Sequence, residues 1–139
     1  MLVVDAEATS GTLADMSTVL LATAADHVHD DIEAALGGDH HVVRVRGGSE
    51  VLDAVRINEP DLVVLDLQIG NMGGLAACMD LRLEQRAGRI PLQRVVLLLD
   101  RDADVFLARQ AEADAWMVKP LDPLALRRTA AETLAAATA

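Results

Sequence analysis

Two charged residues, Asp66 and Lys119, offer the clearest chemistry in this sequence of 139 residues. Asp66 ends the apolar run Leu62–Leu65 and opens a glycine-rich loop, and Lys119 follows the apolar run Trp116–Val118 directly before Pro120. Short apolar runs of this kind predict buried strands. Because parallel strands present their carboxyl ends at one edge of a sheet, we expect the carboxylate and the ammonium group to share a charged pocket there.

The elements that must position these two residues form five successive pairs of a strand and a helix. We expect strands over 18–22, 41–46, 62–66, 95–99 and 116–118, each followed by a helix. Asp26, Ser49 and Asp122 are predicted N-caps, with Pro123 at the first position of the last helix. Strands this apolar favour a parallel sheet with helices on both faces. The predicted fold is therefore α/β, a flavodoxin-like doubly wound (βα)5 domain with strand order 2-1-3-4-5.

Length and composition set limits on the kind of protein this is. A chain of 139 residues fits one domain, which we place over 16–139, with 1–15 as an N-terminal tail or upstream extension. No apolar stretch is long enough to cross a membrane, and no secretory signal is evident. The one cysteine, Cys78, cannot form an internal disulfide, so we expect a cytoplasmic location and a packing role for this thiol.

The net charge of −10 argues against direct binding of nucleic acid, which requires clustered cations. Arginines gather locally on two predicted helices and their flanking loops, and we interpret them as solvated faces, with a docking patch for an acidic partner as the alternative. The four histidines lack a nearby cysteine or acid at ligand spacing, so we expect no metal site from them. These residues are His27, His29, His40 and His41.

Three segments together resemble the receiver domain of bacterial response regulators, over about residues 17–137. They are Asp61–Asp66, Asn71–Leu75 and Val118–Leu121. The resemblance implies that Asp66 occupies the position that accepts a phosphoryl group from a histidine kinase. It also implies that Lys119 pairs with this carboxylate and then with the phosphoryl oxygens, and that the bond before Pro120 is cis.

The sequence departs from that family at four places, one of which is Gly70, where the family often has proline. Two acidic residues that help to hold Mg²⁺ normally follow the first strand, and Thr23 and Ala24 stand there instead. The hydroxyl residue at the end of the fourth strand is replaced by Leu99, or by Leu97 if the alignment carries a gap elsewhere. Trp116 occupies the position of a mobile Tyr or Phe. Since Mg²⁺ requires octahedral oxygen ligands, we expect no cofactor, or Mg²⁺ bound weakly.

Our leading hypothesis is a stand-alone, atypical receiver domain of a two-component or phosphorelay system. It would hold Asp66 and Lys119 in a static ion pair and act through protein contacts without normal Mg²⁺-dependent phosphorylation, so we expect no enzyme activity. Its partner would be a signalling protein, with a histidine kinase as one candidate. The resemblance places the output surface at Phe106, Arg109, Trp116, Arg127 and Arg128, a surface that would also support a homodimer.

Two alternatives remain open at this point. One is a genuine phospho-acceptor, phosphorylated at Asp66 by an unidentified kinase. The other is a small α/β domain that binds a flavin or a nucleotide at the same crevice, which the fold permits. Against the second stand the shortage of aromatic residues and a glycine-rich loop that lacks the lysine and hydroxyl of a phosphate loop.

Overall fold

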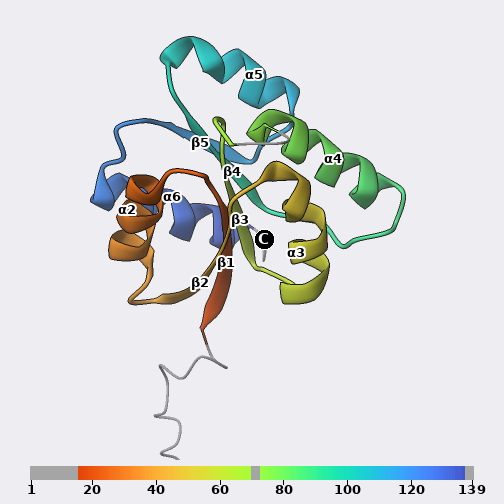
Figure 1. The fold of residues 1–139 in the computed structure, drawn as a ribbon, viewed down its shortest axis with the longest axis horizontal. Helices are drawn as coiled ribbons and strands as arrows, with labels where there is room; N and C mark the ends of the chain where they lie inside the picture. Colours follow the sequence, from red (N-terminus) through yellow and green to blue (C-terminus); the bar gives the residue numbers. More distant parts are fainter. Residues whose placement is uncertain (1–15, 70–72, 137–139) are drawn as a thin grey trace, which may run out of the picture.

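A single parallel sheet forms the centre of the computed structural model, which describes residues 16–69 and 73–136 (Figure 1). Its strand order is β2-β1-β3-β4-β5, as predicted, and every neighbouring pair runs parallel. The strands are β1 Ser17–Ala22, β2 His40–Val45, β3 Leu62–Asp66, β4 Val95–Leu99 and β5 Ala115–Val118. The tail predicted over 1–15 lies outside the described residues.

Helices cover both faces of this sheet. They are α2 Asp26–Leu36, α3 Val51–Asn58, α4 Gly74–Arg86, α5 Val105–Gln110 and α6 Pro123–Ala136, with short 3-10 turns η2 Gly48–Glu50 and η3 Asp102–Asp104. The helices α2 and α6 pack on one face, and α3, α4 and α5 pack on the other (Figure 1). The doubly wound architecture expected from the five strand–helix pairs is therefore confirmed.

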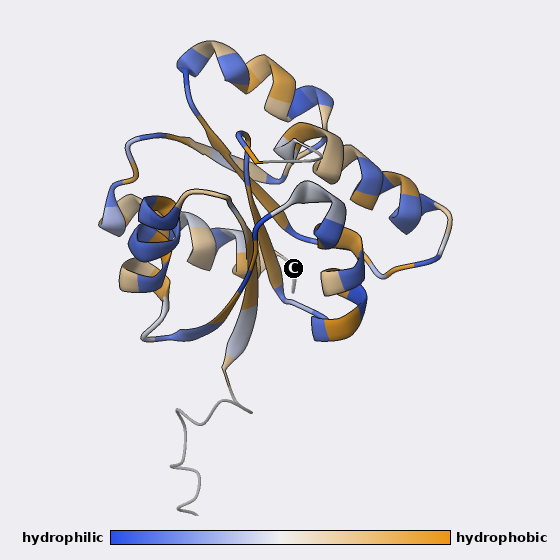
Figure 2. Ribbon diagram, viewed as in Figure 1, coloured by the Kyte–Doolittle hydropathy of each residue, from blue (hydrophilic) through white to orange (hydrophobic). Residues whose placement is uncertain are grey.

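The core consists of two apolar layers that alternate along each strand. In β4, Val95, Leu97 and Leu99 face α3, α4 and α5, whereas Val96 and Leu98 face α2 and α6. All five side chains are buried. At the centre of Figure 2 the strands β3 and β4 therefore show the hydrophobic colour, while hydrophilic residues are distributed over the helices and β2. A strand buried on both faces needs an unbroken apolar run, which explains the sequence pattern.

Two of the three predicted helix caps are wrong. Asp26 is the first residue of α2 and does not cap it. Its carboxylate instead accepts a hydrogen bond from Arg44 Nη1 at 2.9 Å and lies 3.3 Å from Arg46 Nη1, so two guanidinium groups of β2 and its end outcompete the backbone amides. Ser49 lies inside η2, because a 3-10 turn precedes α3 and leaves no side-chain cap there.

The third cap, at the start of α6, is confirmed. Asp122 Oδ2 accepts a hydrogen bond from the backbone N–H of Ala125 at 2.9 Å, and Pro123 is the first residue of the helix. Proline suits this position because its missing N–H would have no partner inside the helix. The cap fixes where α6 begins, directly after the segment that carries Lys119.

Candidate functional site

Asp66 ends β3, next to the centre of the sheet, and its carboxylate is 1% exposed. Both oxygens have hydrogen-bond donors. Thr23 Oγ1 donates to Oδ2 at 2.7 Å, whereas the ammonium of Lys119 donates to Oδ1 at 2.6 Å. The backbone N–H of Gln68 also donates to Oδ1, at 3.1 Å. The structure thus brings together the carboxylate and the ammonium group that the sequence predicted to meet.

Lys119 contacts a second carboxylate as well. Its ammonium donates to Asp100 Oδ1 at 3.1 Å, and Asp100 directly follows β4 at the same edge of the sheet. Burial alone would lower the pKa of Lys119, but the hydrogen bonds and charges of Asp66 and Asp100 outweigh it and raise that pKa above its usual value. Lys119 is therefore a firmly protonated cation that bridges two anions.

The residues predicted at the degenerate acidic positions have opposite placements. Thr23 is fully buried and its hydroxyl group, besides donating to Asp66, accepts the backbone N–H of Ala25 at 3.1 Å. Its carbonyl accepts a hydrogen bond from Arg44 Nε at 3.1 Å. Ala24 is exposed and provides no polar side-chain atom. Thr23 is therefore an integral part of the pocket, held by hydrogen bonds to β2 and to Asp66.

Gly74 allows α4 to begin against the backbone of Asp66. A Cβ atom at this position would lie 2.3 Å from the carbonyl oxygen of Asp66, which no side chain tolerates. The neighbouring Gly73 has room, since its Cβ would lie 3.7 Å from the Leu67 carbonyl oxygen. Of the three glycines in the loop after Asp66, Gly74 is required by close packing and Gly73 is not, while Gly70 lies outside the described residues.

The predicted switch positions contain no hydroxyl group. Leu99 and Leu97 are both fully buried in the layer under α3, α4 and α5. Leu99 contributes through its backbone, because its carbonyl accepts the N–H of Lys119 at 2.8 Å. The peptide bond between Lys119 and Pro120 is cis, as the family resemblance implied.

The predicted output surface is only partly assembled. The guanidinium of Arg109 on α5 lies 5.5 Å from the ring centre of Trp116 on β5, and Phe106 on α5 is 64% exposed. Arg127 on α6 instead lies 3.9 Å from Asp39, just beyond α2. Arg128 is exposed on α6. Among the described contacts, none joins either α6 arginine to the pair of Arg109 and Trp116.

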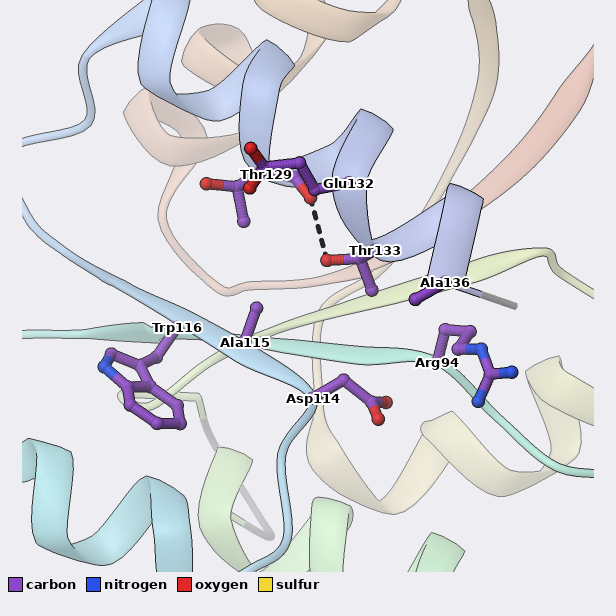
Figure 3. Close-up of a pocket in the computed structure, with 8 residues that line it drawn as sticks. All are labelled: Arg94, Asp114, Ala115, Trp116, Thr129, Glu132, Thr133 and Ala136. Atoms are coloured by element: carbon purple, nitrogen blue, oxygen red, sulfur yellow. Dashed lines mark hydrogen bonds between the residues drawn. The ribbon is translucent and has the colours of Figure 1, made fainter. Parts of the chain in front are cut away.

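A cavity of about 490 Å³ lies at the other end of the strands (Figure 3). Its walls come from the segments just before β4 and β5, from β5 itself and from the last turns of α6. The lining residues are Arg94, Asp114, Ala115, Trp116, Thr129, Glu132, Thr133 and Ala136. A smaller hollow of about 330 Å³ lies between Lys119 and α2. The large cavity is therefore not the crevice at which a flavin or nucleotide was considered.

The donor set beside Asp66 fits a magnesium ion poorly. Mg²⁺ requires near-octahedral oxygen ligands and gives up water reluctantly. Both oxygens of Asp66 already accept hydrogen bonds, and the ammonium of Lys119 lies between the two carboxylates. Over residues 16–69 and 73–136, no three His, Cys, Asp or Glu side chains gather closely enough to hold a metal ion.

Sequence reasoning missed two contributors to the pocket. Asp100 follows a predicted strand that ends at the same sheet edge as Asp66, so its position alone could have identified it. Arg44 lies on the edge strand β2, yet its side chain is only 11% exposed and hydrogen-bonds to the carbonyl of Thr23 and to the carboxylate of Asp26. Its role could not be read from the alternation of β2.

None of the helices in the described part of the chain combines the length and the apolar character needed to span a bilayer.

Comparison with known sequences gives a consistent result. The model of the response regulator receiver domain matches residues 16–131. The DNA-binding response regulator MtrA of Mycobacterium tuberculosis is 32% identical over 123 residues, which covers 88% of this chain and 45% of MtrA. The chain thus spans about half the length of the curated relatives that it matches.

Solved receiver domains share the fold. The receiver domain of RstA from Klebsiella pneumoniae, solved in a BeF3-activated form, aligns with a TM-score of 0.73 at 27% identity, covering 84% of this chain and 97% of that one. The receiver domain of the sensor histidine kinase PA1611 from Pseudomonas aeruginosa aligns with a TM-score of 0.75 at 19% identity, covering 86% and 98%. The PA1611 domain carries a magnesium ion in its active-site cleft.

Proposed function

The chain belongs to the response regulator receiver domain family, and we propose that it is an atypical member that signals through protein contacts without magnesium-dependent phosphorylation of Asp66. One observation carries the proposal. The carboxylate of Asp66 is buried and already accepts hydrogen bonds from Thr23, Gln68 and Lys119. A carboxylate held by three hydrogen-bond donors has less freedom to attack phosphorus, since an ionised carboxylate offers about four acceptor sites.

The charge balance of the pocket supports the same conclusion. Phosphoryl transfer depends on positive charge that offsets the repulsion between an anionic nucleophile and an anionic phosphoryl group. The cation available here is Lys119, which already neutralises parts of Asp66 and Asp100. With Thr23 and Ala24 in place of the metal-binding acids, the pocket offers little to recruit Mg²⁺, so we propose that the ion is absent or weakly bound.

Signalling would then depend on a protein partner in the cytoplasm, with a histidine kinase as one candidate, and the domain would not act as an enzyme. The surface formed by Phe106, Arg109 and Trp116 supports this proposal, because an exposed aromatic ring beside a cation–aromatic pair is typical of protein contacts. The same surface would serve a homodimer. That the receiver acts without an attached effector remains a prediction.

A second candidate function is that of an ordinary phospho-acceptor. It is favoured by the direct contact of Lys119 with Asp66, which the family resemblance led us to expect. The cavity of about 490 Å³ lies away from Asp66, so it gives no support to the binding of a flavin or nucleotide at the crevice beside this residue.

A beryllofluoride titration distinguishes the two candidates. Beryllofluoride with millimolar Mg²⁺ would be added to the isotopically labelled chain while the amide resonances of Thr23, Gln68 and Lys119 are followed by NMR. We expect these resonances to stay in place, whereas the receiver domain of RstA, as the positive control, should respond under the same conditions. Saturable shifts in this chain would refute the proposal and establish Asp66 as an acceptor.

A further inference from the structure

Asp100 provides an anion inside the pocket that the proposed function does not require. Its Oδ1 accepts a hydrogen bond from Lys119 at 3.1 Å, while its Oδ2 is buried without a hydrogen-bond partner. The Asp100 side chain is 32% exposed and that of Asp66 is 1% exposed. Asp100 is therefore the carboxylate of this pair that solvent reaches more readily.

We propose that Asp100 competes with incoming ligands for the ammonium group of Lys119. By holding this group, Asp100 excludes phosphoryl groups and other oxyanions from Asp66. This inference rests on the proposed function, because it names the residue that keeps the pocket unphosphorylated. Lys119 is the only lysine in the chain. A hydrogen bond that it donates to Asp100 is therefore unavailable to an incoming oxyanion, and no other lysine can supply it.

The electrostatic reason is local. Asp66, Asp100 and Lys119 together carry a formal charge of −1, so an incoming oxyanion meets net repulsion at short range. Like charges held close together in a partly desolvated site repel each other strongly, because little solvent screens them. Removing the charge of Asp100 would leave Asp66 and Lys119 as a neutral pair, and it would release one hydrogen-bond donor of the ammonium for an oxygen of the ligand.

The reaction used as a probe balances without any further reactant. An oxygen of Asp66 attacks the phosphorus of acetyl phosphate, and the bond between phosphorus and the acetyl oxygen breaks. Acetate leaves with the electron pair, and the carboxylate becomes an acyl phosphate. No group is oxidised or reduced. The rate depends on how readily the anionic reagent approaches Asp66 and on the positive charge that offsets its repulsion.

The experiment compares the wild type with Asp100→Asn and Asp100→Ala, each incubated with acetyl phosphate and Mg²⁺. The matched control is Asp102→Asn, which changes the net charge equally at an exposed site two residues away. Intact-mass measurement follows addition of the phosphoryl group, and circular dichroism checks folding. We expect both Asp100 variants to be modified at least about tenfold faster than the wild type and the control.

The outcomes separate this inference from the proposed function. Folded Asp100 variants that react no faster than the wild type would overturn the role of Asp100, as would an equal gain in Asp102→Asn. Rapid modification of the wild type would instead overturn the proposed function. A still higher rate of modification in Asp100→Asn would nevertheless support the role of Asp100 as a competitor for Lys119. Adding Asp66→Asn to Asp100→Asn should abolish the modification, and its persistence would place the reaction elsewhere.

Discussion

Replacement of Lys119 by methionine is the most direct test of the ion pair that organises the pocket. The substitution keeps an unbranched apolar side chain of similar length but removes the ammonium group. Asp66 would retain the hydrogen bonds from Thr23 and Gln68, yet its charge and that of Asp100 would have no cation beside them. We expect a large loss of stability with little change of fold.

The magnitude follows from the geometry. At an effective dielectric constant of about 20, unit charges as close as the 2.6 Å between Lys119 Nζ and Asp66 Oδ1 attract by about 6 kcal/mol. Desolvation offsets part of this attraction, and breaking one partner of a buried pair costs about 3–5 kcal/mol in practice. Because Lys119 keeps 21% of its side-chain surface exposed, we expect the lower end, about 3 kcal/mol.

Urea unfolding at pH 7 measures this loss of stability, with Arg128→Met as a control that removes an exposed cation.

A second measurement follows the stability difference as a function of pH. Because the pKa of Lys119 is raised in the folded chain, its contribution is fully present below the ordinary lysine value of about 10.4 and is lost as the pH rises through the folded value. The stability difference between wild type and Lys119→Met should therefore shrink only above about pH 10.

Two results would refute this reasoning. One is a loss of unfolding free energy in Lys119→Met at pH 7 that is no larger than the loss in the Arg128→Met control, which would mean that Asp66 tolerates burial without its cation. The other is a stability difference between wild type and Lys119→Met that stays constant far above pH 10. A double-mutant cycle with Asp66→Asn adds a third criterion, since the two changes should be non-additive by at least about 1 kcal/mol if the groups interact directly.

Three further predictions concern side-chain and backbone packing, one beside Asp66 and two elsewhere in the fold. Gly74→Ala should destabilise the chain by about 1–3 kcal/mol and perturb the Asp66 amide resonance, whereas Gly73→Ala should leave both nearly unchanged; chemical unfolding and NMR check this. Arg82→Ala should cost about 3 kcal/mol in a urea titration, because this buried guanidinium hydrogen-bonds two carbonyls and a carboxylate between α4 and the strands; a loss below about 1 kcal/mol would contradict it. Burial raises the pKa of Cys78 to about 11, so iodoacetamide at pH 8 should label this thiol only in urea.

The fold could be predicted from the sequence because each strand is apolar throughout and each helix carries a periodic apolar face. Val28, Ile32 and Leu36, spaced four apart, all became buried residues of α2. Helix boundaries were accurate where backbone chemistry alone decides them, as at Pro123. They failed at Asp26, because the arginines that bind its carboxylate are distant in the sequence and reach it only through strand pairing.

The site was predictable to the extent that strand ends define it. Asp66 and Lys119 follow apolar runs, so the parallel topology brought them together. Asp100 follows such a run too, but a charged residue after a strand is usually a solvated loop residue, and only the contact with Lys119 distinguishes it. The hydrogen bond from Thr23 depends on a side-chain rotamer, which no spacing rule specifies.

The sparse aromatic content has a practical consequence for experiments on this domain. The chain contains one tryptophan and no tyrosine, so its ultraviolet-excited emission comes almost entirely from Trp116. This indole is half-buried on the edge strand, beside Arg109 and three residues before Lys119. A natural fluorophore thus reports on the surface where we expect a partner to dock. Docking, dimerisation and unfolding could each be followed optically in the unlabelled protein.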